Sequence, residues 1–155
     1  MTDISLIPEV NLNREMQTMR DVNFPIDTVF EAFVNPVHSA NWWGPAGFTN
    51  TYHEFNPVPY GSWKFTMHGP DGKNYENESM FLLVQKPDCV IIDHVSAPEF
   101  RAVFQFEALS PDSTRIHWRM IFKTDELFNA LKDFVKEKNV ENMDRLETEL
   151  SNVRC

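Results

Sequence analysis

The chain has 155 residues, of which 42% are hydrophobic and 13% are aromatic, and its 14 basic and 23 acidic residues give a net charge of −9 at pH 7. This length predicts a single domain with a substantial core, while the negative charge disfavours binding to nucleic acid or to anionic membrane surfaces. No uncharged apolar run approaches the roughly 20 residues that cross a bilayer.

Residues 1–15 follow no regular pattern and are expected to form an N-terminal extension, with one domain running from residue 16 to residue 153. The extension carries acidic residues among its apolar ones and lacks the basic start and apolar stretch of a secretory signal. The two cysteines, Cys89 and Cys155, have no spacing typical of a zinc site or a disulfide framework. We therefore expect a protein of the reducing cytoplasm.

The first part of the domain predicts a strand followed by two short helices. Residues 16–24 include an alternation of apolar and polar side chains, which is typical of a half-buried strand. Pro25 then opens a short helix, because proline at the first helical position and an acid in the first turn are start signals. This helix ends at Asn35, since the residue before a proline avoids the α region, and Pro36 opens a second helix that runs to about Trp42.

Beyond Gly47 the hydrophobic period changes to two, which predicts a sheet. The expected strands are Thr49 to Phe55, Ser62 to His68, Tyr75 to Gln85, Cys89 to Val95, Arg101 to Leu109 and Thr114 to Lys123. Every connection between them is short and contains proline, so neighbouring strands must pair antiparallel.

The last segment, residues 125–153, contains neither glycine nor proline and predicts one long amphipathic helix. Its apolar stripe is expected to comprise Leu127, Leu131, Phe134, Val135, Leu146 and Leu150. The fold class is therefore α+β, with a curved antiparallel sheet wrapped around a long C-terminal helix and enclosing an apolar pocket.

Three of the predicted strands carry large apolar side chains on one face and mostly polar side chains on the other. The apolar positions are Trp63, Phe65, Met67, Ala102, Phe104, Phe106, Trp118, Met120 and Phe122. Two interpretations stay open, an ordinary core beneath the helix and the lining of a small-molecule pocket.

Asn139 and Asn142 interrupt the apolar stripe of the long helix between Val135 and Leu146. A buried amide without a partner costs on the order of 1–3 kcal/mol, so both side chains must bond to something. The alternatives are an internal partner, in the sheet or in the loop after the second helix, and a bound ligand.

Several motifs resemble one protein family over residues 24–150. They are Trp42-Trp43-Gly44-Pro45-Ala46-Gly47-Phe48-Thr49, Gly61-Ser62-Trp63-Lys64-Phe65-Thr66-Met67-His68-Gly69-Pro70-Asp71-Gly72, Asn77-Glu78-Ser79, Asp93-His94 and Trp118-Arg119-Met120. Together they are similar to small proteins related to the C-terminal domain of the activator of the 90-kDa heat-shock chaperone ATPase, in the START-like, birch-pollen-allergen-like (SRPBCC) superfamily. The resemblance implies a helix-grip fold of order β-α-α-β6-α, with the long helix capping a cavity.

The superfamily includes carriers, receptors and cyclases on one scaffold, so the resemblance leaves the activity open. The leading hypothesis is a protein that binds a small apolar or aromatic molecule as a carrier, sensor or sequestering protein. The candidate ligand-binding residues are Trp42, Trp43, Phe48, Trp63, Phe65, Met67, Tyr75, Phe104, Phe106, Trp118, Met120, Asn139 and Asn142. The double tryptophan has two interpretations, a partner-binding surface patch and a ring that closes the mouth of the cavity on a glycine-bearing loop.

An enzyme that uses acid–base chemistry, such as a cyclase or hydrolase, is the second hypothesis. His94 follows the apolar run that ends at Asp93, and Glu78 or Tyr75 is a candidate to face it. A carboxyl group desolvated beside the rings would have a raised pKa and suit this role. The alternative is that these polar groups satisfy a strand end. The histidines show no metal-ligand spacing, and we expect neither a metal nor a cofactor.

The third hypothesis is a co-chaperone-like module whose surface binds another protein. The chaperone activator works with an additional N-terminal domain, for which this chain has no room, so we do not expect a chaperone partner. A homodimer through an exposed strand edge is compatible with the sequence, although nothing in the sequence requires one.

Overall fold

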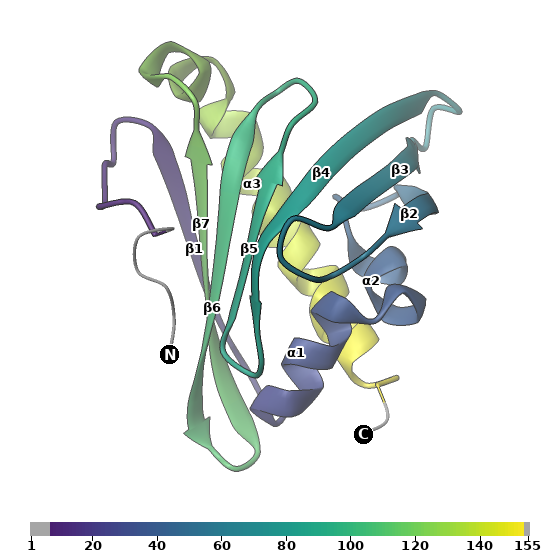
Figure 1. The fold of residues 1–155 in the computed structure, drawn as a ribbon, viewed down its shortest axis with the longest axis vertical. Coiled ribbons are helices and arrows are strands. Elements are labelled where there is room, and N and C mark those ends of the chain that lie inside the picture. The colour runs from purple at the N-terminus through teal and green to yellow at the C-terminus, as the bar shows by residue number, and fades with distance from the viewer. Residues whose placement is uncertain (1–6, 154–155) are drawn as a thin grey trace.

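The computed structural model describes residues 7–153, which form a curved sheet gripping a long helix (Figure 1). The elements are β1 (Glu15–Val22), α1 (Ile26–Val34), α2 (Pro36–Trp42), β2 (Thr49–Phe55), β3 (Ser62–His68), β4 (Asn74–Gln85), β5 (Cys89–His94), β6 (Phe100–Ser110), β7 (Ser113–Phe122) and α3 (Asp125–Leu150). This order confirms the predicted α+β helix-grip class, and the element bounds differ from the predicted ones by a few residues at most. Cys155 lies outside the described residues.

The sheet has seven antiparallel strands in the order β1-β7-β6-β5-β4-β3-β2. The short connections from β2 to β7 make each strand pair with the next, and β1 joins by pairing with β7, where Thr18 lies opposite Trp118. β-Bulges interrupt the register of three strand pairs, β2 with β3, β4 with β5 and β6 with β7. Bulges increase local twist and bend a strand, which suits a sheet that curves around a helix.

The α3 helix crosses the concave side of the sheet, and α1 and α2 lie beside its C-terminal half (Figure 1). Thr124 caps α3, because its side chain accepts a hydrogen bond from the Leu127 amide, and acidic residues in the first turn favour the helix start. Phe134 was predicted to face the core, but it is 62% exposed. The neighbouring Val135 takes the inward position, and successive helical residues point about 100° apart.

Apolar side chains are buried on both faces of the sheet. The concave face carries the main core, whereas the convex face carries a smaller cluster of Leu82, Cys89, Ile91 and Val103, against which Ile7 packs. The second face, predicted to be mostly polar along three strands, therefore carries buried apolar side chains at the centre of the sheet. The N-terminal segment supplies the cover that the strand pattern alone does not reveal.

Within the described residues, no helix has the length and apolar character needed to cross a membrane.

Candidate functional site

Four aromatic rings meet at the centre of the concave face, and we call them the ring cluster: Trp43, Trp63, Phe104 and Trp118. Trp63 comes from β3, Phe104 and Trp118 are cross-strand partners on β6 and β7, and Trp43 comes from the loop after α2. The centroid of the Trp43 ring lies 5.0 Å from that of Trp63, 6.2 Å from Phe104 and 6.3 Å from Trp118. The predicted burial of the strand rings is confirmed.

The ring cluster contains buried polar atoms that have no hydrogen-bond partner. Among the described residues, the buried side-chain polar atoms without a partner are Trp63 Nε1, Trp118 Nε1 and Asn50 Oδ1. Buried polar groups are nearly always paired in folded proteins. Two unpaired indole donors, whose rings both pack against Trp43, therefore distinguish this site from an ordinary apolar core.

Tyr52 is a polar side chain whose pKa is affected by the Trp63 indole. Its hydroxyl forms a hydrogen bond with Ser39 Oγ at 2.9 Å. Burial raises the pKa of Tyr52, and this effect is partly opposed by Ser39 and by the Trp63 N–H group. Trp63 Nε1 is therefore close enough to influence Tyr52 but has no hydrogen-bond partner.

The two asparagines of α3 have different environments. Asn142 donates from Nδ2 to the Trp42 carbonyl at 2.8 Å and accepts from the Gly44 amide at 3.3 Å. Its partner is thus the loop after the second helix, one of the two alternatives drawn from the sequence. Asn139 is also buried, but its amide nitrogen reaches only the sulfur of Met120, at 3.8 Å. A thioether is a weak acceptor, so Asn139 adds a poorly used donor on the helix side.

Arg145 of α3 holds the loop that carries Trp43. Its Nη1 donates to the carbonyls of Trp43, Gly44 and Pro45 at 3.2, 2.9 and 3.0 Å, and its Nη2 donates to the Asn41 carbonyl at 2.9 Å. Burial lowers the pKa of the Arg145 guanidinium. Sequence reasoning missed this residue, because an arginine on the polar side of a helix gives no sign that it will bind backbone carbonyls.

The remaining ring and methionine candidates fall into two groups. Met120 is buried in the core, whereas Met67 is partly buried and packs against it. Trp42, Phe65 and Phe106 are core side chains, and Trp42 fixes α2 to α1 by donating from Nε1 to the Ala32 carbonyl at 2.9 Å. Phe48 and Tyr75 lie at the outer end of the concave face, with ring centroids 6.1 Å apart, and Tyr75 is 44% exposed.

The acid–base candidates are not brought together. Glu78 is exposed and lies opposite Lys64, whereas His94 lies opposite Ser79, so the two side chains project from opposite faces of the sheet. His94 donates from Nδ1 to the Pro98 carbonyl at 2.8 Å, and its Nε2 lies 2.8 Å from Asn77 Oδ1. Burial lowers the pKa of His94. The His94 ring thus donates a hydrogen bond to the backbone of the turn after β5.

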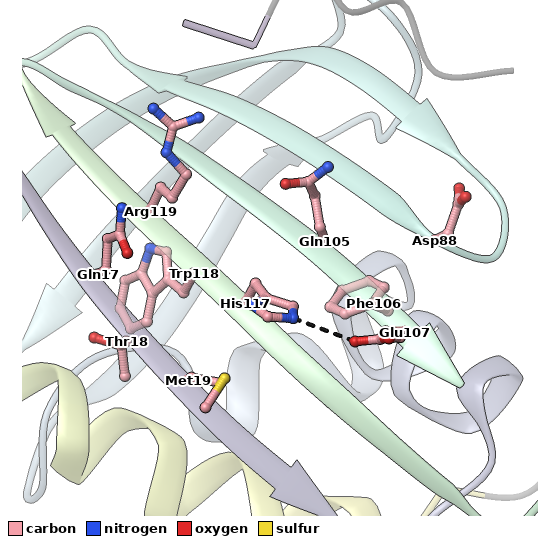
Figure 2. A pocket seen from close by; sticks show the side chains of 10 residues that line it. All are labelled: Gln17, Thr18, Met19, Asp88, Gln105, Phe106, Glu107, His117, Trp118 and Arg119. Carbon is pink, nitrogen blue, oxygen red and sulfur yellow. Dashed lines mark ion pairs between the residues drawn. The ribbon is translucent and has the colours of Figure 1, made fainter. Parts of the chain in front are cut away.

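A trough with a volume of about 660 Å³ lies on the convex face, across β1, β7 and β6 (Figure 2). Its lining residues are Gln17, Thr18, Met19, Asp88, Gln105, Phe106, Glu107, His117, Trp118 and Arg119. Figure 2 shows His117 directed toward Glu107, at 3.6 Å, while Arg119 binds Glu15 through two hydrogen bonds of 2.8 and 2.9 Å. These charged groups engage one another, so the trough offers less unused bonding capacity than the ring cluster.

Glu15, the partner of Arg119, is a buried carboxyl group with a lowered pKa. Burial alone would raise the pKa of Glu15, but hydrogen bonds from Arg119, Gln17 and the Asn11 amide lower it.

The described residues contain no cluster of three or more histidine, cysteine, aspartate or glutamate side chains that could hold a metal ion. The ring cluster, with its unused donors, is therefore the candidate functional site.

Comparisons with known proteins agree with this architecture. The family model described as "Activator of Hsp90 ATPase homolog 1-like protein" matches residues 23–151. Similar solved structures include a protein from Nitrosomonas europaea, with 18% identity, a TM-score of 0.84, and coverage of 92% of this chain and 97% of that one. A protein from Arthrobacter aurescens has 18% identity and a TM-score of 0.84, with coverage of 94% and 90%.

A further similar structure is the AHSA1 protein from Silicibacter pomeroyi, with 18% identity, a TM-score of 0.71, and coverage of 88% of this chain and 97% of that one. At these identities the likeness supports the fold alone. No curated protein matches the sequence. Because the family model spans most of the chain and the sheet grips α3 as the superfamily resemblance predicted, the chain belongs to the activator of Hsp90 ATPase homolog 1-like family, within the START-like (SRPBCC) superfamily.

Proposed function

We propose that this protein binds a small apolar or aromatic molecule at the ring cluster, between the concave face and α3. The observation that carries the proposal is the pair of unpaired indole donors, Trp63 Nε1 and Trp118 Nε1. An unsatisfied buried donor costs about 1–3 kcal/mol, and a ligand that carries a hydrogen-bond acceptor would recover this free energy on binding. Asn139 supplies a third donor from the facing helix.

The composition of the site supports the same ligand class. Apolar rings with a few convergent polar groups are typical of small-molecule sites. Phe65 and Met120 extend the apolar lining, and Phe48, Met67 and Tyr75 provide an outer rim for an entering molecule. Asn142 contributes indirectly, by holding the loop that carries Trp43. Trp42 also contributes indirectly, by fixing α2 to α1. We favour binding over turnover because the two acid–base candidates lie on opposite faces of the sheet.

A thermal-shift screen of the purified protein tests the proposal. The compounds are aromatic acids, aromatic ketones, fatty acids and sterols, each at several concentrations. A ligand at 100 times its dissociation constant adds about 2.7 kcal/mol to the free energy of unfolding, which raises the Tm of a domain this size by about 5–10 °C. We expect a saturable shift confined to compounds that carry an acceptor group.

Two variants locate the binding site. Trp118→Phe keeps an aromatic ring but removes the unpaired N–H group, so it should weaken the shift. Gln105→Ala changes the convex trough and should leave the shift intact. The proposal is wrong if no compound class shifts the Tm, or if Gln105→Ala abolishes a shift that Trp118→Phe preserves.

A further inference from the structure

Trp43 is the only member of the ring cluster that comes from a loop, and it is half-buried while its three partners are almost fully buried. Trp63, Phe104 and Trp118 are 2%, 0% and 3% exposed. The strand rings are fixed by the ladder of the sheet, since Phe104 and Trp118 are direct cross-strand partners. Trp43 alone reaches the cluster from outside the sheet.

Within residues 7–153, each buried side-chain polar atom without a partner belongs to a residue that touches Trp43. The rings of Trp63 and Trp118 pack against the Trp43 ring, and Asn50 donates from its amide nitrogen to the Trp43 carbonyl at 2.8 Å. Asn50 Oδ1 is the third unpartnered atom. The three unpartnered atoms therefore belong to residues that all contact Trp43, two through its ring and one through its main-chain carbonyl.

The loop of Trp43 is attached to α3 and to β2 through polar contacts. Gly44 and Gly47 adopt φ angles of +96° and +88°, a backbone region that favours glycine. The loop is held to α3 by hydrogen bonds, from Arg145 to three carbonyls, from the Gly44 amide to Asn142 Oδ1, and from the Ala46 amide to Glu141 at 3.1 Å. Trp42, the preceding residue, is anchored in the core by the hydrogen bond from its Nε1 to the Ala32 carbonyl.

We infer that the indole ring of Trp43 occupies the place of the ligand, so that Trp43 and the ligand compete for one slot between Trp63, Phe104 and Trp118. This inference rests on the proposed function. When the loop swings away from α3, the two indole N–H groups become available to a ligand acceptor. The ligand that fits is a flat molecule of about the size of an indole ring that carries a carbonyl or similar acceptor. The closed loop thereby sets the affinity, because a ligand binds only the open fraction of molecules.

Two matched probes test the inference, 1-indanone, which carries a ketone acceptor, and indane, which has the same ring system without it. Their dissociation constants are measured by ligand-observed NMR for the wild type, Trp43→Ala and Trp43→Ala/Trp118→Phe. We expect Trp43→Ala to bind 1-indanone at least 10-fold more tightly than the wild type does. The preference for 1-indanone over indane should then fall about 5-fold or more in the double variant, as loss of a hydrogen bond to a buried donor predicts.

Arg145→Met provides a second variant that leaves the Trp43 ring in place. Releasing the loop should raise the affinity for 1-indanone and increase the acrylamide quenching of the Trp43 fluorescence, which is isolated by subtracting the spectrum of Trp43→Phe. Gln105→Ala on the convex face is the control for both readouts.

The possible outcomes separate the two proposals. If 1-indanone binds in a manner that depends on Trp118 but is equally tight in the wild type, Trp43→Ala and Arg145→Met, the proposed site stands and the competition by Trp43 is wrong. If Trp43→Ala binds both probes equally well, the substitution has only made a cavity, which also overturns the inference. If neither probe binds any variant, and the thermal-shift screen is also negative, the proposed function itself fails.

Discussion

Replacing Arg119 by methionine should destabilise the protein strongly, because it breaks a buried ion pair. The Glu15 side chain is 0% exposed and the Arg119 side chain 11% exposed, so the two charges form a buried pair beneath the N-terminal segment. Glu15 also accepts hydrogen bonds from the Asn11 amide at 2.8 Å and from Gln17 at 3.2 Å. Arg119→Met leaves this carboxylate buried with no cationic partner.

Removing one partner of a buried ion pair costs about 3–5 kcal/mol, because the remaining charge is left desolvated. For a domain of this size, such a loss lowers the Tm by about 6–20 °C. Adding Glu15→Gln removes the stranded charge and keeps an acceptor for the Asn11 amide. The double variant should therefore be more stable than Arg119→Met alone, by about 2 kcal/mol.

Urea denaturation of the wild type, the two single variants and the double variant measures this coupling. The pH dependence provides a second check. In the wild type the folded pKa of Glu15 is lowered, so its contribution to stability is present above the ordinary value of 4.5 and is lost as the pH falls. In Arg119→Met the pKa of Glu15 should be raised by burial, so that this variant recovers stability relative to the wild type as the pH falls from 7 toward 5. A cost below about 1 kcal/mol for Arg119→Met, with no recovery in the double variant, would refute the burial of this pair.

Three further substitutions test contacts around the site. Glu149→Gln removes the carboxylate that binds His38 at 2.8 Å and should cost about 1–3 kcal/mol at pH 7. Burial alone would raise the pKa of Glu149, but its hydrogen-bond donors lower it, so urea midpoints of variant and wild type should converge as the pH falls below 4.5. Asn142→Leu leaves the Gly44 amide without its side-chain acceptor and should cost about 1–3 kcal/mol in urea denaturation, whereas a neutral result would contradict the bond. Gly44→Ala places a side chain at a φ of +96° and against the Met67 methyl group, so a thermal melt should show a loss of about 1–2 kcal/mol, and an unchanged Tm would argue against this loop geometry.

The order of elements could be predicted from the sequence because its signals are local. Proline-bearing turns separate the strands, Pro25 and Pro36 open the two short helices, and residues 125–150 contain no helix breaker. Burial on the concave face followed equally from alternation along β3, β6 and β7. These features depend on neighbouring residues in the chain, so periodicity and turn chemistry are sufficient to find them.

The details of the site depend on contacts between distant segments, and these were harder to predict. The binding of Arg145 to the carbonyls near Trp43 joins residues about a hundred positions apart, and no residue pattern marks backbone acceptors. The opposite orientations of Glu78 and His94 follow from the pairing register of β4 with its neighbours, which a single sequence does not fix. The unpaired state of Trp63 Nε1 and Trp118 Nε1 is a property of packed side chains and has no signature in the sequence.

The sheet is open, because β1 and β2 stand at its two ends and do not pair with each other in the part of the chain that the structure describes. In a closed barrel, the number of strands and their stagger fix the radius. The strand number of an open sheet does not fix its radius. The two edge strands can therefore move apart or closer together on either side of α3 while every strand keeps its neighbours. The width of the concave side can then differ through changes at the two margins. One set of strand pairings is thus compatible with more than one width, without altering the ladder that holds the molecule together.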